Sequence, residues 1–274
     1  MNVTSATKLL AVIGDPVRHS LSPLMHNGWI ADYGLDAVYT ALPLKSDDAT
    51  SVIRSMKALG FTGLNVTVPH KEAAARAADR TESEVANTLR WEDDGTLSAF
   101  NTDGLGFIDA LTETAPDWRG RVSRIFIIGA GGAGLGIGKA LSAYADTVHF
   151  ANRTLARAEA AASAVPNGRV LRWEDLERGF GAADLIVQTT TLGMVGQLSH
   201  DWPVRLCRST VIVADIVYKP LETDFLRAAR ARGLVAMDGL GMLIHQGARA
   251  FELWFGVKPD TQKARARLLA ALGG

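Results

Sequence analysis

Short apolar runs alternate with longer amphipathic segments along most of the chain. Runs rich in β-branched and aromatic residues are typical of strands, and longer segments that begin at capping residues are typical of helices. The predicted strands are 9–13, 37–42, 61–68, 124–128, 147–151, 170–173, 185–188, 211–215 and 235–237. The predicted helices include 22–33, 47–59, 72–78, 135–144, 155–164, 224–232 and a long one ending at residue 256. This alternation favours an α/β fold, and from residue 124 onward it predicts a parallel, doubly wound sheet.

Closely spaced glycines follow the buried strand 124–128. Gly129, Gly131 and Gly134 fit the G-x-G-x-x-G spacing, in which the glycines permit a tight turn, the approach of a diphosphate and close packing of helix on strand. The first N–H groups of the following helix would then hold the anion. The sequence therefore predicts a nucleotide site formed by Gly129, Ala130, Gly131, Gly132, Ala133 and Gly134, with an ordinary turn as the alternative. Gly136 and Gly138 should each weaken the helix by about 1 kcal/mol relative to Ala.

The end of the next strand indicates which dinucleotide is bound. NAD-binding units usually carry an acidic residue there, which bonds the ribose 2′-hydroxyl. Here the chain reads Asn152-Arg153-Thr154. A guanidinium can bind a 2′-phosphate with two charge-assisted hydrogen bonds, whereas a carboxylate would repel it. We therefore predict NADP, although Thr154 could simply cap the helix 155–164 and Arg153 could be solvated.

The composition of the chain limits the classes of molecule that we expect it to bind. The 274 residues suffice for two domains, and 29 basic residues balance 29 acidic ones. We therefore expect neither nucleic acid nor a membrane surface as a partner. The polar start, residues 1–8, precedes an apolar run too short for a membrane span or a secretion signal. Cys207 is the single cysteine, which agrees with a cytoplasmic location, and the six histidines show no metal-ligand spacing.

The first 70 residues contain two groups of candidate polar side chains. Ser22 precedes Pro23 and would cap the helix 22–33, but capping does not explain Ser20. Two hydroxyls beside a helix N-terminus also suit a carboxylate, so both interpretations stay open. Asn65 and Thr67 are two positions apart on a strand and should project from the same face.

Two charged residues lie at the expected starts of helices. The positive charge of Lys71 at a helix N-terminus opposes the helix macrodipole and is unfavourable by about 0.3–1 kcal/mol. This placement suggests a functional use of Lys71, and a solvated lysine at a helix start stays open as the alternative. Asp103 would be the N-cap of the helix that carries 108–111. Between them, 87–89 and 97–100 flank Asp93-Asp94-Gly95 and predict a hairpin. Further along, 189–194 could line the nicotinamide side of the nucleotide site.

Taken together, these stretches resemble the shikimate dehydrogenase family over nearly the whole chain. The matching motifs are His19-Ser20-Leu21-Ser22-Pro23, Asn65-Val66-Thr67-Val68-Pro69-His70-Lys71, Asn101-Thr102-Asp103-Gly104, the glycine turn, Asn152-Arg153-Thr154, Tyr218 with Pro220, and Gly239-Leu240-Gly241-Met242-Leu243 with Gln246. The resemblance implies an α/β substrate domain, residues 1–104 and 239–274, with C-terminal helices returning to it. A Rossmann domain that binds NADP would occupy 105–238.

The resemblance also implies a role for each candidate. Lys71 and Asp103 would be the catalytic pair. The substrate carboxylate would be held by Ser20, Ser22 and Tyr218, and its hydroxyls and keto oxygen by Asn65, Thr67, Asn87 and Gln246. The cofactor would contact the glycine turn, Asn152, Arg153, Thr154, Thr190, Gly239 and Met242.

The implied reaction is the reversible reduction of 3-dehydroshikimate by NADPH, in the shikimate pathway to chorismate and aromatic amino acids. Its small-molecule substrate would be the main partner of a cytoplasmic monomer or homodimer. Two segments depart from the family pattern: the chain is shortened before Asn87, and it reads Gln188-Thr189-Thr190-Thr191 where an Asn-x-Thr-Ser pattern is usual. Such differences suit a paralogue acting on quinate or an aminated analogue, and a non-catalytic ligand sensor on the same scaffold is a third hypothesis.

Overall fold

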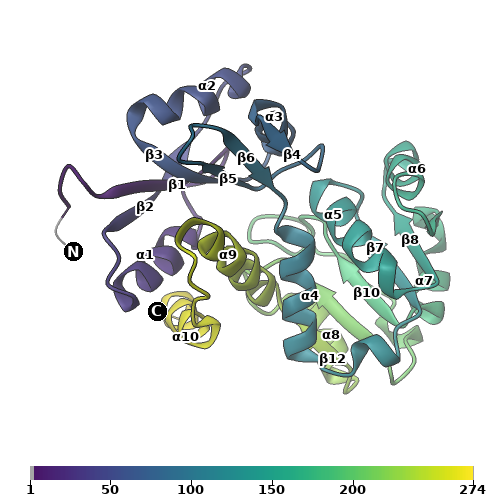
Figure 1. The fold of residues 1–274 in the computed structure, drawn as a ribbon. Helices are drawn as coiled ribbons and strands as arrows, with labels where there is room; N and C mark the ends of the chain where they lie inside the picture. Colours follow the sequence, from purple (N-terminus) through teal and green to yellow (C-terminus); the bar gives the residue numbers. More distant parts are fainter. Residues whose placement is uncertain (1–2, 274) are drawn as a thin grey trace. The chain divides into compact units, whose positions relative to one another are not determined.

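A computed structural model describes residues 3–273 and divides into two compact units. The first contains the described residues up to Thr102 and those from Gln246 onward, and the second runs from Asp103 to His245 (Figure 1). The second boundary falls inside helix α9 (Gly239–Phe255), because its early residues pack in the second unit. A Cβ added at Gly241 would lie 3.3 Å from Ala110. The sequence placed the boundaries at 104/105 and 238/239, at the ends of predicted elements.

The first unit is built on a mixed six-stranded sheet in the order β2-β1-β3-β5-β6-β4. Its strands are β1 (Lys8–Gly14), β2 (Ala37–Pro43), β3 (Phe61–Val66), β4 (Arg80–Thr81), β5 (Thr88–Trp91) and β6 (Leu97–Phe100). Strand β1 is parallel to both β2 and β3, whereas β5 is antiparallel to β3 and β6. The predicted hairpin is therefore confirmed as β5–β6. The two-residue β4 has no sequence signal and was not predicted.

The helices of the first unit are α1 (Ser22–Asp32), α2 (Ala49–Ser55), α3 (Lys71–Ala77), the C-terminal part of α9 and α10 (Thr261–Leu272), with the 3₁₀ turn η1 (Met56–Leu59). The predicted helix 47–59 is thus α2 followed by η1, and it ends at Gly60, whose φ of +85° suits glycine. Helix α9 packs on the sheet at Gly63, where an added Cβ would lie 2.3 Å from the indole nitrogen of Trp254. Glycine at that position lets the helix approach the sheet.

The second unit contains a fully parallel sheet in the order β12-β11-β10-β7-β8-β9. Its strands are β7 (Arg124–Ile128), β8 (Thr147–Ala151), β9 (Gly168–Val170), β10 (Leu185–Gln188), β11 (Ile212–Asp215) and β12 (Val235–Met237). This confirms the doubly wound α/β prediction. The predicted strand 170–173 is wrong in its bounds, because β9 ends at Val170 and a hydrogen bond from the Leu171 N–H to the Phe150 carbonyl (2.9 Å) closes its pairing with β8. The chain then turns into η4 (Trp173–Asp175).

Helices cover both faces of this sheet (Figure 1). Those of the second unit are α4 (Asp103–Thr114), α5 (Gly132–Leu141), α6 (Leu155–Ser163), α7 (Leu176–Ala182) and α8 (Asp224–Ala231), with the turns η2 (Trp118–Gly120), η3 (Ser142–Tyr144) and η5 (Val204–Leu206). Helices α4, α5 and α6 contribute to one apolar core, and α7 and α8 to another. The helical glycine Gly138 has a packing reason, because a Cβ there would lie 2.4 Å from the Phe150 ring. Close packing thus offsets the low helix propensity.

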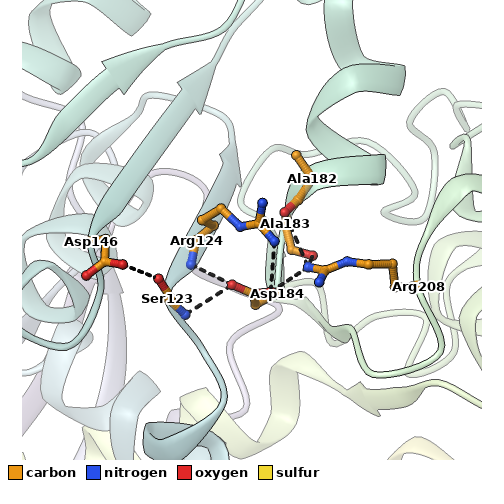
Figure 2. A network of polar contacts seen from close by, with 7 residues as sticks. All are labelled: Ser123, Arg124, Asp146, Ala182, Ala183, Asp184 and Arg208. Carbon is orange, nitrogen blue, oxygen red and sulfur yellow. Dashed lines mark hydrogen bonds and ion pairs between the residues drawn. The ribbon is translucent and has the colours of Figure 1, made fainter.

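A polar network links the starts of β7 and β10 (Figure 2). The carboxylate of Asp184 accepts hydrogen bonds from the backbone N–H groups of Ser123 (3.1 Å) and Arg124 (2.7 Å), and it forms an ion pair with Arg208. Burial alone would raise the pKa of Asp184, but these hydrogen bonds and the nearby guanidinium groups lower it. The network therefore secures the ends of the strands remote from the glycine turn. In the described range 3–273, no helix combines the length and apolar character needed to cross a membrane.

Candidate active site

The glycine turn connects β7 to α5, and its glycines lie in different surroundings. Gly129 has a φ of +107°, and a Cβ there would lie 2.6 Å from the hydroxyl of Thr189. At Gly134 an added Cβ would lie 2.4 Å from the carbonyl oxygen of Gly129. Gly131 and Gly132 instead face open space, with no atom within 4 Å of an added Cβ. The turn is therefore tight on one side and open on the other, as a diphosphate site requires.

The residues after β8 connect the glycine turn to the part of the site where the adenosine of NADP is predicted to bind. Asn152 accepts a hydrogen bond from the Ala130 N–H (3.4 Å) and donates one to the Thr154 carbonyl (3.0 Å). Thr154 occupies the N-cap position of α6, but its side chain makes no capping hydrogen bond, so capping does not account for this residue. The side chain of Arg153 is exposed and forms no ion pair within the described part of the chain. Arg157, exposed in the first turn of α6, is a second cation that we had not predicted.

The loop after β10 packs against the glycine turn. The hydroxyl of Thr189 donates to the Ile128 carbonyl (2.9 Å). Gln188 is fully buried; its Nε2 donates to the Leu192 carbonyl (3.0 Å), and its Oε1 accepts from the Thr190 N–H. The Gln188 side chain thus shapes this loop from inside. The departure from the usual family pattern is accommodated by these hydrogen bonds.

A buried carboxylate supports the next loop, and we had not singled it out. Asp215, at the end of β11, accepts from the Val217 N–H (2.9 Å), the Thr223 hydroxyl (2.7 Å) and Nε2 of Gln188 (3.2 Å). Burial raises the pKa of Asp215 to about 6, although the hydrogen bonds from Val217 and Thr223 oppose the rise. An acidic residue ending an apolar strand was the available sequence signal.

The supported loop carries Tyr218, which is partly buried. Burial raises the pKa of this phenol above its usual range, so the hydroxyl stays protonated and can donate a hydrogen bond. Gly239 begins α9 close to the same loop, where a Cβ would lie 2.3 Å from the Ile216 carbonyl oxygen. Met242 packs in the apolar core and is 7% exposed.

In the first unit, the two serines lie at the start of α1. The Ser22 N–H donates to the hydroxyl oxygen of Ser20 (3.2 Å). The N-cap residue is Leu21, and Ser22 is the first helical residue, so the capping interpretation of Ser22 is wrong. Ser22 is buried, with 5% of its surface exposed. Recognition of a carboxylate by the two hydroxyls stays a prediction.

Asn65 lies on β3 and is held on all sides. Its Oδ1 accepts a hydrogen bond from the Tyr39 hydroxyl (2.7 Å), and its Nδ2 donates to the Asn87 carbonyl (3.1 Å) and the Thr88 hydroxyl (3.1 Å). Thr67 is partly buried just beyond the end of the strand, and its N–H donates to the Ile13 carbonyl (2.9 Å).

Asn87 is firmly placed despite the shortened segment before it. Its N–H donates to the Phe100 carbonyl (3.0 Å), and its carbonyl accepts from the Val66 N–H (2.8 Å), so the sheet fixes its backbone. Its side-chain amide donates to the Thr102 hydroxyl (3.0 Å) and to Oε1 of Gln246 (3.2 Å). Three of the predicted substrate residues, Asn65, Asn87 and Gln246, therefore belong to one network with Tyr39, Thr88 and Thr102.

The predicted catalytic pair begins two helices. Lys71 is the first residue of α3, is partly buried, and accepts a hydrogen bond at its carbonyl from the Ala86 N–H (2.9 Å). Asp103 is buried and is the first residue of α4, within the helix and not at the N-cap position we predicted. It directly follows Thr102, whose N–H donates to the side chain of Asn87 (2.8 Å).

The fold and these sites define a class of protein. A doubly wound parallel sheet with an open glycine turn, followed by exposed cations at the end of its second strand, is typical of oxidoreductases that bind a dinucleotide. Three family models match the chain: a shikimate dehydrogenase substrate binding domain at residues 12–88, shikimate / quinate 5-dehydrogenase at 113–195, and a shikimate 5′-dehydrogenase C-terminal domain at 239–269. The protein belongs to the shikimate dehydrogenase family.

Individual relatives match this chain over nearly their full lengths. The chain is 43% identical over 270 residues to the shikimate dehydrogenase (NADP(+)) of Dinoroseobacter shibae, with 96% of this chain and 97% of that protein covered. A crystal structure of shikimate 5-dehydrogenase from Thermus thermophilus, in complex with NADP(H) and shikimate, matches with a TM-score of 0.84 and 34% identity, covering 97% and 100% of the chains. Quinate dehydrogenase from Corynebacterium glutamicum, in complex with NAD, matches with a TM-score of 0.89 and 30% identity, covering 96% and 99%.

Proposed function

We propose that the protein catalyses the reversible reduction of 3-dehydroshikimate to shikimate with NADPH. The near full-length similarity to a protein named shikimate dehydrogenase (NADP(+)) carries most weight. The polar network around Asn65 and Asn87 supports it, because a polyhydroxylated substrate needs several fixed hydrogen-bonding groups.

The geometry of the second unit fits NADP. The open side of Gly131 and Gly132 would hold the diphosphate, together with the first N–H groups of α5. Arg153, with Arg157 and beside Asn152 and Thr154, would hold the 2′-phosphate. Thr190, Gly239 and Met242 would lie at the nicotinamide end. Bound NADPH supplies the hydride that reduces the substrate carbonyl.

The substrate would be held by its carboxylate and its hydroxyls. The hydroxyls of Ser20, Ser22 and Tyr218 are suited to the carboxylate, since each can donate a hydrogen bond. Asn65, Thr67, Asn87 and Gln246 would contact the hydroxyls and the keto oxygen. Their mutual hydrogen bonds limit the freedom of Asn65 and Asn87 before the substrate arrives, which lowers the entropic cost of binding.

Lys71 and Asp103 would carry the proton chemistry. As the carbonyl carbon is reduced, its oxygen gains negative charge and needs a proton donor within hydrogen-bond reach. The ammonium group of Lys71 would stabilise that charge and donate the proton. The carboxylate of Asp103 would keep the ammonium oriented, and in the oxidative direction the same groups would accept the proton.

The product would serve the pathway to chorismate and the aromatic amino acids. We infer a cytoplasmic location, which a single, buried cysteine supports, because no disulfide is needed within the chain. A monomer or homodimer acting on a small-molecule substrate is the expected form, without nucleic acid or a membrane as partner.

Oxidation of quinate is the second candidate, because quinate dehydrogenase matches the fold closely. That protein is described in complex with NAD, whereas Arg153 favours a 2′-phosphate. An aminated analogue of shikimate, or ligand sensing without catalysis, would use the same network.

The test is a set of four mixtures of purified protein: shikimate or quinate, each with NADP or NAD, followed at the absorbance of the reduced cofactor. Rapid reduction of NADP with shikimate, and much slower reaction elsewhere, is the expected result. Preference for quinate or NAD would support the second candidate. A folded protein that binds NADPH but reacts in none of the mixtures would contradict both.

A further inference from the structure

We propose that a cavity beside α7 in the second unit is a binding site for a small molecule that carries an anionic group on an apolar ring. The cavity has a volume of about 240 Å³. Its lining combines positively charged or polar nitrogen groups with an apolar floor and includes Arg124, Arg178, His149, Phe126, Leu171 and Gly179. Among the described residues, none that lines the cavity is acidic. The inference is independent of the proposed function, because these residues belong to neither the substrate site nor the cofactor site proposed above.

The parallel sheet brings the polar and apolar parts of the cavity to one face. Phe126 on β7 is in register with His149 on β8, which is in register with Arg169 on the edge strand β9. Residues in register project from the same face of a sheet. Phe126 packs in the apolar core to which α7 contributes, so the row faces that helix. An apolar ring, an imidazole and a guanidinium therefore follow one another across three strands.

The nearest carboxylate is already shared between two cations. Asp184 forms ion pairs with both Arg124 (3.6 Å) and Arg208, and Figure 2 shows these two arginines on either side of it. Arg208 also donates to the carbonyls of Ala182 (3.3 Å) and Ala183 (2.9 Å). The negative end of α7, which would otherwise disfavour an anion, is thus compensated.

Two further arginines add positive charge without a partner. Arg169 and Arg178 are exposed, and neither forms an ion pair within residues 3–273. Burial lowers the pKa of the half-buried His149, and the charges of Arg169 and Arg178 lower it further. The imidazole therefore lies in a positive field. A carboxylate or a phosphate would reduce this repulsion and accept paired hydrogen bonds from a guanidinium.

The volume and the floor of the cavity limit the rest of the ligand. A dry cavity of about 150 Å³ is large enough for benzene, so about 240 Å³ holds one six-membered ring with an anionic group. Pockets for larger ligands start at roughly 300 Å³. The floor against such a ring would be formed by Phe126 and Leu171, which belong to the same apolar core.

This cavity is separate from the glycine turn. Arg124 is the first residue of β7, and the turn follows the last, so the five-residue strand separates them by roughly 16 Å. Helix α5, whose first N–H groups belong to the proposed nucleotide site, packs in the other apolar core. A ligand in the cavity and a bound dinucleotide should therefore not compete.

The test is a titration at constant pH, followed by NMR of the His149 ring, with the protein saturated with NADP. Phenyl phosphate and benzoate are the anionic probes, and benzyl alcohol supplies the ring without the charge. We expect at least one anion to shift the His149 signal with a Kd of about 1 mM or lower, and benzyl alcohol to cause no shift. The tighter of the two anions distinguishes a phosphorylated ligand from a carboxylated one.

Arg178→Gln is the informative variant, and Arg227→Gln is its control. Arg178 is exposed, so its replacement should keep the fold, and we expect the Kd of the anion to rise about tenfold. Arg227 is an exposed arginine of α8 that pairs with Asp224 (2.7 Å) outside the cavity, so its replacement should leave the Kd unchanged. An equal Kd in Arg178→Gln and the parent protein, or no shift with either anion, would overturn the inference. Because the measurement needs no turnover and can be repeated without NADP, failure of the proposed function would not change its outcome.

Discussion

The side-chain amide of Asn87 lies 3.2 Å from Oε1 of Gln246, a residue 159 positions away in the chain. Thr102 completes the connection, because its N–H donates to Oδ1 of Asn87 and its hydroxyl lies 3.1 Å from the Gln246 carbonyl. Thr102 and Gln246 are also the points where the chain leaves and re-enters the first unit. Asn87, a proposed substrate residue, therefore connects the two segments at which the chain leaves and re-enters the first unit.

Asn87→Ala should weaken both the fold and substrate binding. It would leave the buried Thr102 N–H without its acceptor, and we expect the free energy of unfolding to fall by about 2 kcal/mol. The KM for shikimate should rise at least about tenfold, because Gln246 also loses its partner. Urea unfolding and steady-state kinetics would measure the two effects. A destabilised variant with an unchanged KM would argue that Asn87 has no part in the site.

Lys71→Ala should reduce kcat by about 10²–10⁴-fold, the usual contribution of a positioned proton donor. The Kd for shikimate, measured by calorimetry, should change far less than kcat. Lys57→Ala is the control, because Lys57 is an exposed lysine of the same unit that donates to the Gly95 carbonyl (3.0 Å). Loss of shikimate binding with turnover retained would count against a catalytic Lys71.

Arg153→Ala should raise the KM for NADP by about 10–100-fold, on the scale of a lost charge-assisted hydrogen-bond pair. The KM for NAD, which lacks the 2′-phosphate, should stay nearly unchanged. Arg172→Ala removes another exposed arginine of the same unit and should alter neither value. Equal losses with both cofactors would mean that Arg153 does not recognise the 2′-phosphate.

Asp215 should make the second unit less stable as the pH rises from about 4 to about 6. Burial raises the pKa of this carboxyl to about 6, so over that interval the folded state binds more protons than the unfolded state. The cost of ionisation amounts to about 3 kcal/mol and is constant above pH 6. Asp215→Asn should remove this dependence, since an amide can still accept from Val217 and donate to Thr223.

The relevant quantity is the difference in unfolding free energy between Asp215→Asn and the parent protein, measured by urea at pH 4 and pH 7. Between pH 4 and pH 7, this difference should shift by about 3 kcal/mol in favour of the variant. Asp201→Asn removes an exposed carboxylate and is the matched control. The same shift in both variants would refute the assignment to Asp215.

His26 should make the first unit sensitive to acid. Burial among aromatic rings lowers its pKa to about 3, and a polar contact with Asn65 offsets only part of that effect. The unfolded chain binds the proton near pH 6.5, so stability is complete above that value and is lost as the pH falls toward 3. The loss at pH 5 is about 2 kcal/mol. His26→Phe, which keeps an aromatic ring against Tyr39, should lose less stability between pH 7 and pH 5; an equal loss would contradict this prediction.

The sequence predicted most of the strands because buried parallel strands leave continuous apolar runs, as in Ile125–Ile128. It also located the glycine turn, since Gly129 and Gly134 satisfy steric conditions that other residues cannot meet. The family and the fold class are confirmed. The domain boundaries and the site residues stay predictions.

Other features depend on contacts between distant segments. The end of β9 is set by its pairing with β8, and nothing in residues 170–173 marks that limit. Ser22 has the local signature of an N-cap, but Leu21 occupies that position and Ser22 is the first residue of the helix. Tyr39 itself was indistinguishable in sequence from an ordinary core aromatic on a strand. Its hydroxyl holds Asn65, a partner that the fold brings to it from β3.

The shared helix α9 has a consequence for the order of folding during synthesis. Every strand of the second unit has been made by Met237, whereas the first unit still lacks the end of α9 and all of α10. The indole N–H of Trp29 donates to the carbonyl of Asp260 (2.9 Å), so the hydrogen-bond partner of this core residue is synthesised 231 positions later. On the ribosome, the inserted unit can therefore finish folding while the unit that encloses it in sequence is incomplete.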